Sequence, residues 1–279
     1  MITLDAFAAR KTAEAERASI EPFETDIDRG EALIAIGNAW SRRMFDGAFY
    51  LSPLPVGEQP ATNLVFVQLR DGNTVAKDPS LLGGGEADKH LVYEGLSRVA
   101  ADAVLAGAGT VRGGNLLLSI WRSELVALRA DLGLPRHPVQ IVATIRGLDL
   151  TRGLMFNSPA LKVIVLTVPH GADVMRRDLA ARPWISLVTM ARAGELAWAF
   201  RELRARGLQR LSCIGGRTLA EELIDAGLVQ DLYLTTSPIA AGEPGTPFYS
   251  KPLASKVVVR KRGTAADAGV TFEHLRLES

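Results

Sequence analysis

Short, continuous apolar runs alternate along the chain with segments whose apolar residues recur at helical spacing. The runs are bounded by glycine, proline or charged residues, as is typical of buried strands. They cover residues 63–69, 103–106, 139–143, 161–167, 185–189, 211–214 and 232–236. Apolar positions at helical spacing predict helices over residues 92–100, 194–206 and 218–226. The succession of strand, helix and strand predicts an α/β domain.

The arrangement of the predicted sheet follows from the character of its runs. Residues 162–167, Lys-Val-Ile-Val-Leu-Thr, are almost continuously apolar. Such a run suits a sheet covered on both faces, which in connected α/β units implies mainly parallel strands with helices on both sides. The end of the chain differs, because residues 256–262 and 270–277 resemble strands separated by a Gly/Ala/Asp turn. They predict a C-terminal antiparallel hairpin.

The first sixty residues have a different pattern and are predicted to form an N-terminal extension. Residues 12–18 predict a charged helix and residues 31–45 a more apolar one. Most of the local aromatic side chains belong to Trp40, Phe45, Phe49 and Tyr50. We expect this cluster to pack on a neighbouring domain or subunit. Residues 52–60 contain three prolines and predict a linker. The expected division is therefore an extension over 1–60 and one catalytic-sized domain over 61–279.

Charge and composition exclude several classes of protein. The 279 residues are 47% hydrophobic, which is enough for a full core, and 32 Lys and Arg balance 31 Asp and Glu. This balance argues against a general nucleic-acid binder. No apolar run approaches the roughly 20 residues that cross a bilayer, so we expect no membrane span. Asp5, Arg10 and Lys11 interrupt the segment where a signal peptide would be apolar, which predicts a cytoplasmic protein.

The chain carries few of the residues that metal or nucleophile chemistry needs. Its single cysteine, Cys213, excludes an internal disulfide and any multi-cysteine metal site. The four histidines lie far apart, with no pair at the spacing that puts two ligands on one helical face, so we expect no metal. The chain also lacks the G-x-S-x-G and G-x-x-x-x-G-K-[ST] motifs of serine hydrolases and P-loop enzymes.

The first candidate for chemistry is a glycine-containing turn after the run at 103–106. Gly107 and Gly109 allow the backbone to come close to a ligand, and Thr110 offers a hydroxyl beside free amide groups. The turn therefore suits a phosphate or a pyrophosphate. It is not a full dinucleotide fingerprint, because Arg112 occupies the position of the third glycine.

A second turn follows the run at 211–214. Gly215 and Gly216 lie between this strand and a helix whose expected N-cap is Thr218. Helix N-termini attract anions through unpaired N–H groups and the helix dipole. Either turn alone is also compatible with a plain strand-to-helix connection. Together, in one α/β domain, the two turns favour a bound nucleotide.

Three segments resemble the signature regions of a known enzyme domain, the reductase domain at the C-terminus of bacterial bifunctional riboflavin-biosynthesis deaminase/reductases. They are residues 69–73, 102–112 and 213–243. The most specific part is the series Gly-Gly-x-x-Leu, Gly-Leu-Val and Ser-Pro-x-x-x-Gly within residues 215–242, and the resemblance runs from about residue 63 to the C-terminus. The zinc deaminase half would need an H-x-E and a P-C-x-x-C motif, so a stand-alone reductase is expected.

The resemblance implies a dihydrofolate reductase-like fold and a homodimer that binds NADPH at the carboxyl ends of the parallel strands. It implies reduction of the ribosyl group of 5-amino-6-(5-phosphoribosylamino)uracil, or of a related compound, to a ribityl group. The cofactor residues that it implies are Gly107, Ala108, Thr110, Val111, Thr144, Arg146, Gly215, Gly216, Thr218 and Leu219. Thr144 and Arg146 would meet the adenosine ribose and its extra phosphate, although Arg146 is equally compatible with a solvated loop charge.

On the substrate side, Asp71 and Gly72 match the Asp-Gly pair that the family places after the first strand. The resemblance makes Asp71 the catalytic residue, since a carboxylate there can accept hydrogen bonds from ribose hydroxyls and help deliver a proton to the opened imine. Asp-Gly is also an ordinary turn pair. Asn63, at the start of the same strand, is a possible second polar contact with substrate.

Departures from the family pattern fall near the substrate. Ile214 stands where a Glu is usual, Leu69 and Arg70 replace a Ser-Leu pair, and the usual Asp-x-Pro after the first glycine turn is missing. One alternative is therefore a reductase of a pterin or of another small carbonyl or imine compound. Another is a non-catalytic nucleotide-binding scaffold whose aromatic extension binds a partner.

Overall fold

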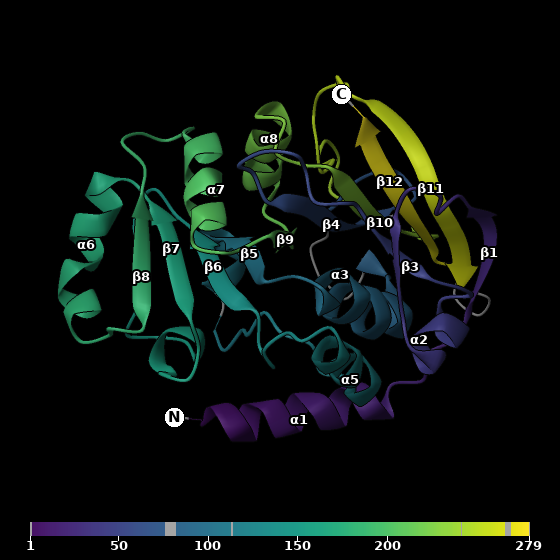
Figure 1. Ribbon diagram of the computed structural model, residues 1–279, viewed down its shortest axis with the longest axis horizontal. Helices are drawn as coiled ribbons and strands as arrows, with labels where there is room; N and C mark the ends of the chain where they lie inside the picture. The colour runs from purple at the N-terminus through teal and green to yellow at the C-terminus, as the bar shows by residue number, and fades with distance from the viewer. Residues whose placement is uncertain (1, 76–81, 113, 241, 266–268, 279) are drawn as a thin grey trace.

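The computed structural model describes residues 2–75, 82–112, 114–240, 242–265 and 269–278 and shows one large sheet at the centre of the molecule (Figure 1). Its parallel strands are β4 (Ala61–Leu69), β5 (Ala103–Gly107), β6 (Val139–Ala143), β7 (Val163–Thr167), β8 (Ile185–Thr189), β9 (Arg210–Cys213) and β10 (Asp231–Ser237). They lie in the order β10-β4-β9-β5-β6-β7-β8, and each neighbouring pair is parallel. The seven predicted strands and their mainly parallel arrangement are confirmed.

Three antiparallel strands extend this sheet on the β10 side. They are β12 (Thr271–Glu278), β11 (Lys256–Ala265) and β1 (Phe23–Asp28). Strand β12 pairs with β10 and with β11, which confirms the predicted C-terminal hairpin. Strand β1, which the sequence pattern did not predict, pairs with β11 at the edge of the sheet. The N-terminal extension therefore contributes a strand to the central sheet.

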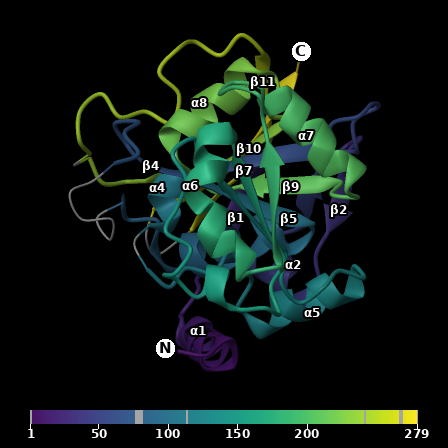
Figure 2. The same ribbon diagram turned by 90° about the vertical axis from the view of Figure 1, so that its left-hand side faces the viewer.

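Helices cover both faces of the sheet, as predicted (Figures 1 and 2). One face carries the π-helix η2 (Ala87–Leu96), α3 (Ser97–Val99) and α5 (Ser123–Asp131); the other carries α7 (Leu196–Ala205) and α8 (Arg217–Asp225). Successive strand residues point to opposite faces. Val104 therefore belongs to a core with Trp121, while Leu105 belongs to a core with Phe200. Helix α6 (Pro169–Ala180) lies beside β8.

None of the helices in the described part of the chain is long and apolar enough to cross a membrane.

The extension differs in detail from its predicted helices. Helix α1 (Leu4–Arg17) begins before the predicted residue 12, because Thr3 caps it. The predicted helix over 31–45 is wrong at its start. Strand β2 (Ile34–Ile36) pairs there with β3 (Phe49–Leu51), and helix α2 is confined to Ala39–Met44. The reason is local: Gly37 has a φ of +139°, and Asn38 then starts α2 through a capping box with Ser41.

The aromatic side chains of the extension pack on the sheet, as predicted. Phe45 lies 4.9 Å from Phe272 of β12, and Phe49 lies 4.8 Å from Tyr233 of β10, measured between ring centroids. Helix α1 packs on the same core cluster, where Phe7 meets Trp121 edge-to-face. The helices and strands of residues 2–51 thus pack together with the sheet, and a connecting segment without helix or strand follows over 52–60. The division at residue 60 stays a prediction.

The packing of Phe45 against Phe272 generates a prediction about stability. Phe45 is only 1% exposed, so Phe45→Ala should leave a cavity that lowers the free energy of unfolding by about 3–5 kcal/mol. Urea denaturation followed by tryptophan fluorescence measures this loss. Val56→Ala, at a fully exposed position, is the control and should change stability by less than about 0.5 kcal/mol. A loss below about 1 kcal/mol in Phe45→Ala would show that the extension contributes little to the fold.

Candidate cofactor and substrate site

The two glycine turns meet at one edge of the sheet. Gly107 ends β5, and Gly215 and Gly216 follow β9; because these strands are parallel neighbours, both turns leave the sheet on the same side. A Cβ atom placed on Gly216 would lie 3.6 Å from the Cα of Gly107. Gly216 also has a φ of +93°, which favours glycine. The expectation that the two turns converge is confirmed.

A cleft of about 360 Å³ opens beside this contact, at the carboxyl ends of the parallel strands. Seven of the ten predicted cofactor residues line it: Gly107, Ala108, Thr144, Arg146, Gly216, Thr218 and Leu219. Thr110 and Gly215 lie next to lining residues in the chain. Val111 does not line this cleft, because its side chain is buried in the core on the face covered by η2 and α5, and its contact with the cofactor stays a prediction.

The start of helix α8 forms one wall of the cleft. Its N-cap is Gly216 and not the predicted Thr218, which lies in the first turn. Among the described side chains, none caps this end. The first-turn N–H groups of a helix have no partner within the helix, and the helix dipole adds positive potential there. This nine-residue helix therefore offers an anion-binding end toward the cleft.

Several residues of the cleft were not predicted as site residues. They are Arg112, Met190, Gly194, Leu196 and Glu222. Arg112 and Arg146 bring positive charge to the cleft, and Glu222 brings negative charge. Met190 comes directly after β8 and was overlooked because it is not part of a glycine turn. Ligands of open α/β sheets bind outside the carboxyl ends of the strands, so a search of every strand end would have found Met190.

Asp71 lies at the same edge of the sheet, directly after β4. The N–H of Asn73 donates to its Oδ1 at 3.1 Å, and the N–H of Gly242 donates to its Oδ2 at 3.4 Å. The hydrogen bond from Asn73 is the main reason that the pKa of Asp71 is lowered. The carboxyl is therefore ionised at neutral pH. It is suited to accept hydrogen bonds from hydroxyl groups.

Two glycines shape the turn that carries Asp71. Gly72 has a φ of +80°, as the predicted Asp-Gly turn requires. A Cβ on Gly242 would lie 2.5 Å from the Cβ of Asn73, so a side chain there would displace the turn. The glycine of the Ser-Pro-x-x-x-Gly segment thus has a role in positioning Asp71.

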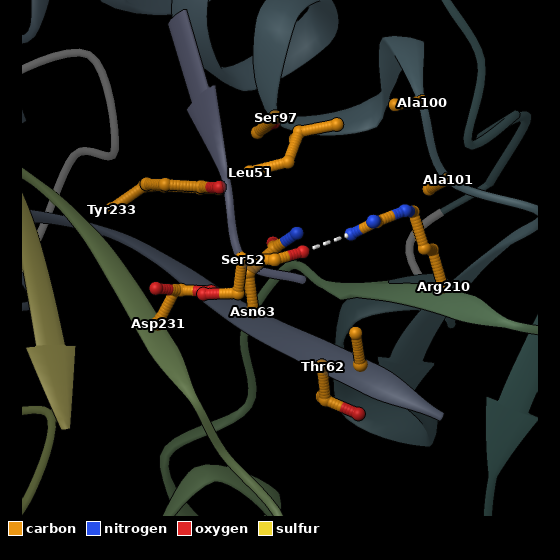
Figure 3. Close-up of a pocket in the computed structure, with 11 residues that line it drawn as sticks. Leu51, Ser52, Thr62, Asn63, Ser97, Ala100, Ala101, Arg210, Asp231 and Tyr233 are labelled. Atoms are coloured by element: carbon orange, nitrogen blue, oxygen red, sulfur yellow. Dashed lines mark hydrogen bonds between the residues drawn. The ribbon is translucent and has the colours of Figure 1, made fainter. Parts of the chain in front are cut away.

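Asn63 lies elsewhere, and its predicted contact with substrate is corrected. It is the third residue of β4 and six residues before Leu69, which corresponds to about 20 Å along a strand. There it faces a cavity of about 10 Å³ with Ser52, Arg210 and Asp231 (Figure 3). Arg210 Nη1 donates to the backbone oxygen of Ser52 at 2.8 Å in this cavity. The structure therefore separates Asn63 from Asp71 by most of the length of strand β4.

The two residues before the second glycine turn, Cys213 and Ile214, are buried and uncharged. Burial raises the pKa of the Cys213 thiol to about 12, so this cysteine is no nucleophile at neutral pH. Ile214, which replaces the family's usual Glu, is 3% exposed and belongs to the core. The position thus supplies packing and no charge.

A buried carboxyl group lies near the carboxyl end of β10. Asp88 of η2 packs beneath Gly84, where a Cβ would lie 2.7 Å from Asp88 Oδ2. Burial raises the pKa of Asp88 to about 6, and the nearby Thr235 hydroxyl and Arg98 charge only partly offset this effect. The neighbouring Gly83 approaches Ser237, the last residue of β10.

With this geometry in view, comparison with known proteins places the chain in a family. Residues 71–271 match the family described as the RibD C-terminal domain. The chain belongs to this family. A curated relative is 2,5-diamino-6-ribosylamino-4(3H)-pyrimidinone 5′-phosphate reductase of Archaeoglobus fulgidus. It is 26% identical over 151 residues, which are 54% of this chain and 68% of the relative.

Solved structures of related proteins share the fold. A pyrimidine reductase-like protein of Corynebacterium diphtheriae superposes with a TM-score of 0.64 at 21% identity, over 79% of this chain and 92% of that one. A diaminohydroxyphosphoribosylaminopyrimidine deaminase/5-amino-6-(5-phosphoribosylamino)uracil reductase of Thermotoga maritima gives a TM-score of 0.59 at 20% identity, over 79% of this chain. The match spans 57% of that longer protein. The predicted dihydrofolate reductase-like fold is thereby confirmed, and membership of a reductase family implies a nicotinamide cofactor and a small-molecule substrate.

The close approach of Gly107 and Gly216 can be tested by a substitution that narrows the space between them. Gly107 has an ordinary φ of −71°, so substitution there should not strain the backbone. Gly107→Val should weaken binding of a reduced nicotinamide dinucleotide at least about tenfold, because its branched side chain enters the cleft. Gly107→Ala is the matched control: its Cβ would meet Gly216 Cα at an ordinary 3.9 Å and should change affinity less than about threefold. Fluorescence titration gives both affinities, and unaltered binding to the Val variant would remove this contact from the site.

Asp88 generates a prediction about pH. Its folded-state pKa of about 6 exceeds the unfolded value, so the protein loses stability as the pH rises from the unfolded pKa through the folded one. Asp88→Asn removes the buried charge. It should stabilise the protein by about 2–3 kcal/mol at about pH 8 and by much less at about pH 4.5. Chemical denaturation at the two pH values measures the difference. An equal effect at both would mean that Asp88 does not titrate as a buried acid.

Proposed function

We propose that the chain is an NADPH-dependent reductase of riboflavin biosynthesis, which reduces the ribosylamino group of a pyrimidine 5′-phosphate to a ribitylamino group. The substrate is 5-amino-6-(5-phosphoribosylamino)uracil or its diaminopyrimidinone relative, the compound named for the Archaeoglobus fulgidus reductase. The observation that carries the proposal is the meeting of Gly107 and Gly216 at the carboxyl ends of the parallel strands, in a chain of this family.

The residues present fit a nicotinamide dinucleotide. The glycine contact leaves backbone exposed where side chains would fill the cleft, and the first turn of α8 offers N–H groups to a diphosphate. Thr144 and Arg146 line the part of the cleft after β6, where Arg146 would bind the extra phosphate of NADPH through its planar guanidinium. When bound, the cofactor supplies a hydride.

The chain's own residues have to align the substrate and control charge. Reduction adds a hydride to the C1′ carbon of the ring-opened imine and a proton to its nitrogen. Asp71 stays ionised, so it would hold sugar hydroxyls as a hydrogen-bond acceptor and fix C1′ in place. The proton then comes from another donor, such as solvent. This assigns Asp71 to substrate orientation and no longer to proton delivery.

Ile214 favours a second candidate. An apolar, buried residue replaces the carboxylate expected near the substrate, so the chain would also suit a pterin or another small carbonyl or imine compound. The scaffold alternative differs in requiring cofactor binding without turnover. A homodimer and a cytoplasmic location remain part of the proposal through the family resemblance.

Purified protein can be offered NADPH with each of the two ribosylaminopyrimidine phosphates and with a dihydropterin, while the absorbance of the reduced nicotinamide is followed. We expect oxidation with a ribosylaminopyrimidine phosphate, and at least about tenfold slower reaction with NADH because Arg146 would lack its phosphate partner. Turnover of the dihydropterin alone would favour the second candidate. NADPH binding without any turnover would favour the scaffold. Rescue of a riboflavin auxotroph that lacks only the reductase provides the matching test in cells.

The role of Asp71 is tested by Asp71→Asn. Loss of charge-assisted hydrogen bonds to the sugar should lower kcat/KM about 10- to 100-fold while NADPH affinity stays within about twofold. Asp131→Asn, which neutralises an exposed carboxylate at the end of α5, is the control and should leave both values unchanged. An equal loss of NADPH affinity and of kcat/KM in Asp71→Asn would be incompatible with the proposed role.

A further inference from the structure

The turn that carries Asp71 is held by a loop from the other end of the domain. We call residues 242–250, which follow β10, the clamp loop. The N–H of Thr74 donates to the Thr246 oxygen at 2.8 Å, and the N–H of Glu243 donates to the Val75 oxygen at 2.9 Å. The Asn73 side chain accepts from the N–H of Thr246 at 2.9 Å. The two segments are therefore joined by backbone hydrogen bonds at Glu243 and Thr246 and by the Asn73 side chain.

The clamp loop is in turn attached to the cofactor helix by Arg217. Its Nε donates to the Pro247 oxygen at 2.9 Å, and its Nη2 lies 3.5 Å from the Gly245 oxygen. Arg217 is the first residue of α8, and its neighbours Gly216 and Thr218 line the cleft. The Arg217 side chain instead extends toward the clamp loop. One residue of this turn thus connects the two halves of the site.

The position of Arg217 is unfavourable for a positive charge. The helix dipole disfavours cations at an N-terminus, so an arginine at the first residue of α8 costs stability unless its contacts compensate. The contacts it makes are two backbone carbonyls of the clamp loop, where Glu243, Pro244 and Gly245 are exposed. The far end of the clamp loop is fixed separately, because Phe248 packs against Phe66 and the Tyr249 hydroxyl donates to Asp225 of α8. The exposed part that faces the Asp71 turn has Arg217 as its attachment to the packed helix, so this attachment has a large effect on its position.

We propose that Arg217 is a positioning residue that holds the substrate turn in register with the cofactor helix. The contacts run from Arg217 through Pro247 and Thr246 to Asn73, whose N–H fixes the Asp71 carboxylate. Helix α8 is itself anchored, because Leu219, Ala220 and Leu223 are buried in the core. The inference rests on the proposed function, since it makes Arg217 a determinant of substrate binding and not of cofactor binding.

The kinetic test uses Arg217→Met, which removes the attachment, and Arg217→Lys, which keeps the charge and one donor. In Arg217→Met, KM for the ribosylaminopyrimidine phosphate should rise about tenfold, while the Kd for NADPH stays within about threefold. Arg217→Lys should give an intermediate KM with an unaltered Kd. An unchanged KM in Arg217→Met, or a rise in the NADPH Kd as large as that in KM, would overturn the inference.

Lys251→Met is the matched control. Lys251 pairs with Asp225 of the same helix, but it lies beyond the clamp loop and outside the contacts that lead to Asp71. Its removal should leave KM unchanged. If Lys251→Met raised KM as much as Arg217→Met, general loosening of the chain after β10 would explain the result, and the specific role of Arg217 would be refuted.

Hydrogen exchange provides a readout that does not depend on activity. Arg217→Met should increase exchange of the Thr74, Glu243 and Thr246 amides, and Lys251→Met should not. If the wild-type protein turns over neither ribosylaminopyrimidine phosphate, the proposed function fails, and the exchange data alone decide the inference. Unchanged protection in Arg217→Met would overturn it in that case also.

Discussion

The close approach of the Gly107 and Gly216 backbones is the contact on which the rest of the site depends. Strand β9 pairs with β5 so that Leu105 lies opposite Cys213. The segments that follow the two strands therefore turn at nearly the same level along the strand direction. A larger side chain at either glycine would occupy the space that the cleft needs. Because β9 comes about a hundred residues after β5 in the sequence, the site forms only when the sheet is complete.

The order of the strands then divides the site into a cofactor part and a substrate part, which are held in place by different contacts. Strand β9 lies between β5 and β4, so the second glycine turn lies between the first glycine turn and the Asp71 turn in the order of the strands. The cofactor part is built on α8 and on strand ends that are packed in the core. The substrate part depends on hydrogen bonds between exposed loops. The departures from the family pattern do not follow this division, because Ile214 and Leu69 are both buried.

The sequence pattern predicted the parallel strands well, because inner strands such as β5 and β7 are buried on both faces and stand out as apolar runs. It failed at the edge of the sheet formed by β1. Strand β1 reads Phe-Glu-Thr-Asp-Ile-Asp, with polar residues that suit an exposed edge and conceal the strand. Helix α6 was missed as well, since most of its residues are partly or fully exposed. In residues 31–45, positive-φ positions and a capping box set the boundaries, and these signals do not appear in hydrophobic periodicity.

The same distinction accounts for the site residues. Glycine turns can be recognised locally because their chemistry depends on the backbone, and both were found. Arg112 was noted only as the residue in place of the third glycine, and no local signal shows that Glu222 of α8 borders the cleft. Asn63 shows the converse. Its residue type suits a ligand contact, but parallel strands present their carboxyl ends at the site, and an early position in β4 lies at the opposite edge. Strand direction, more than residue type, therefore decides which polar side chains reach the ligand.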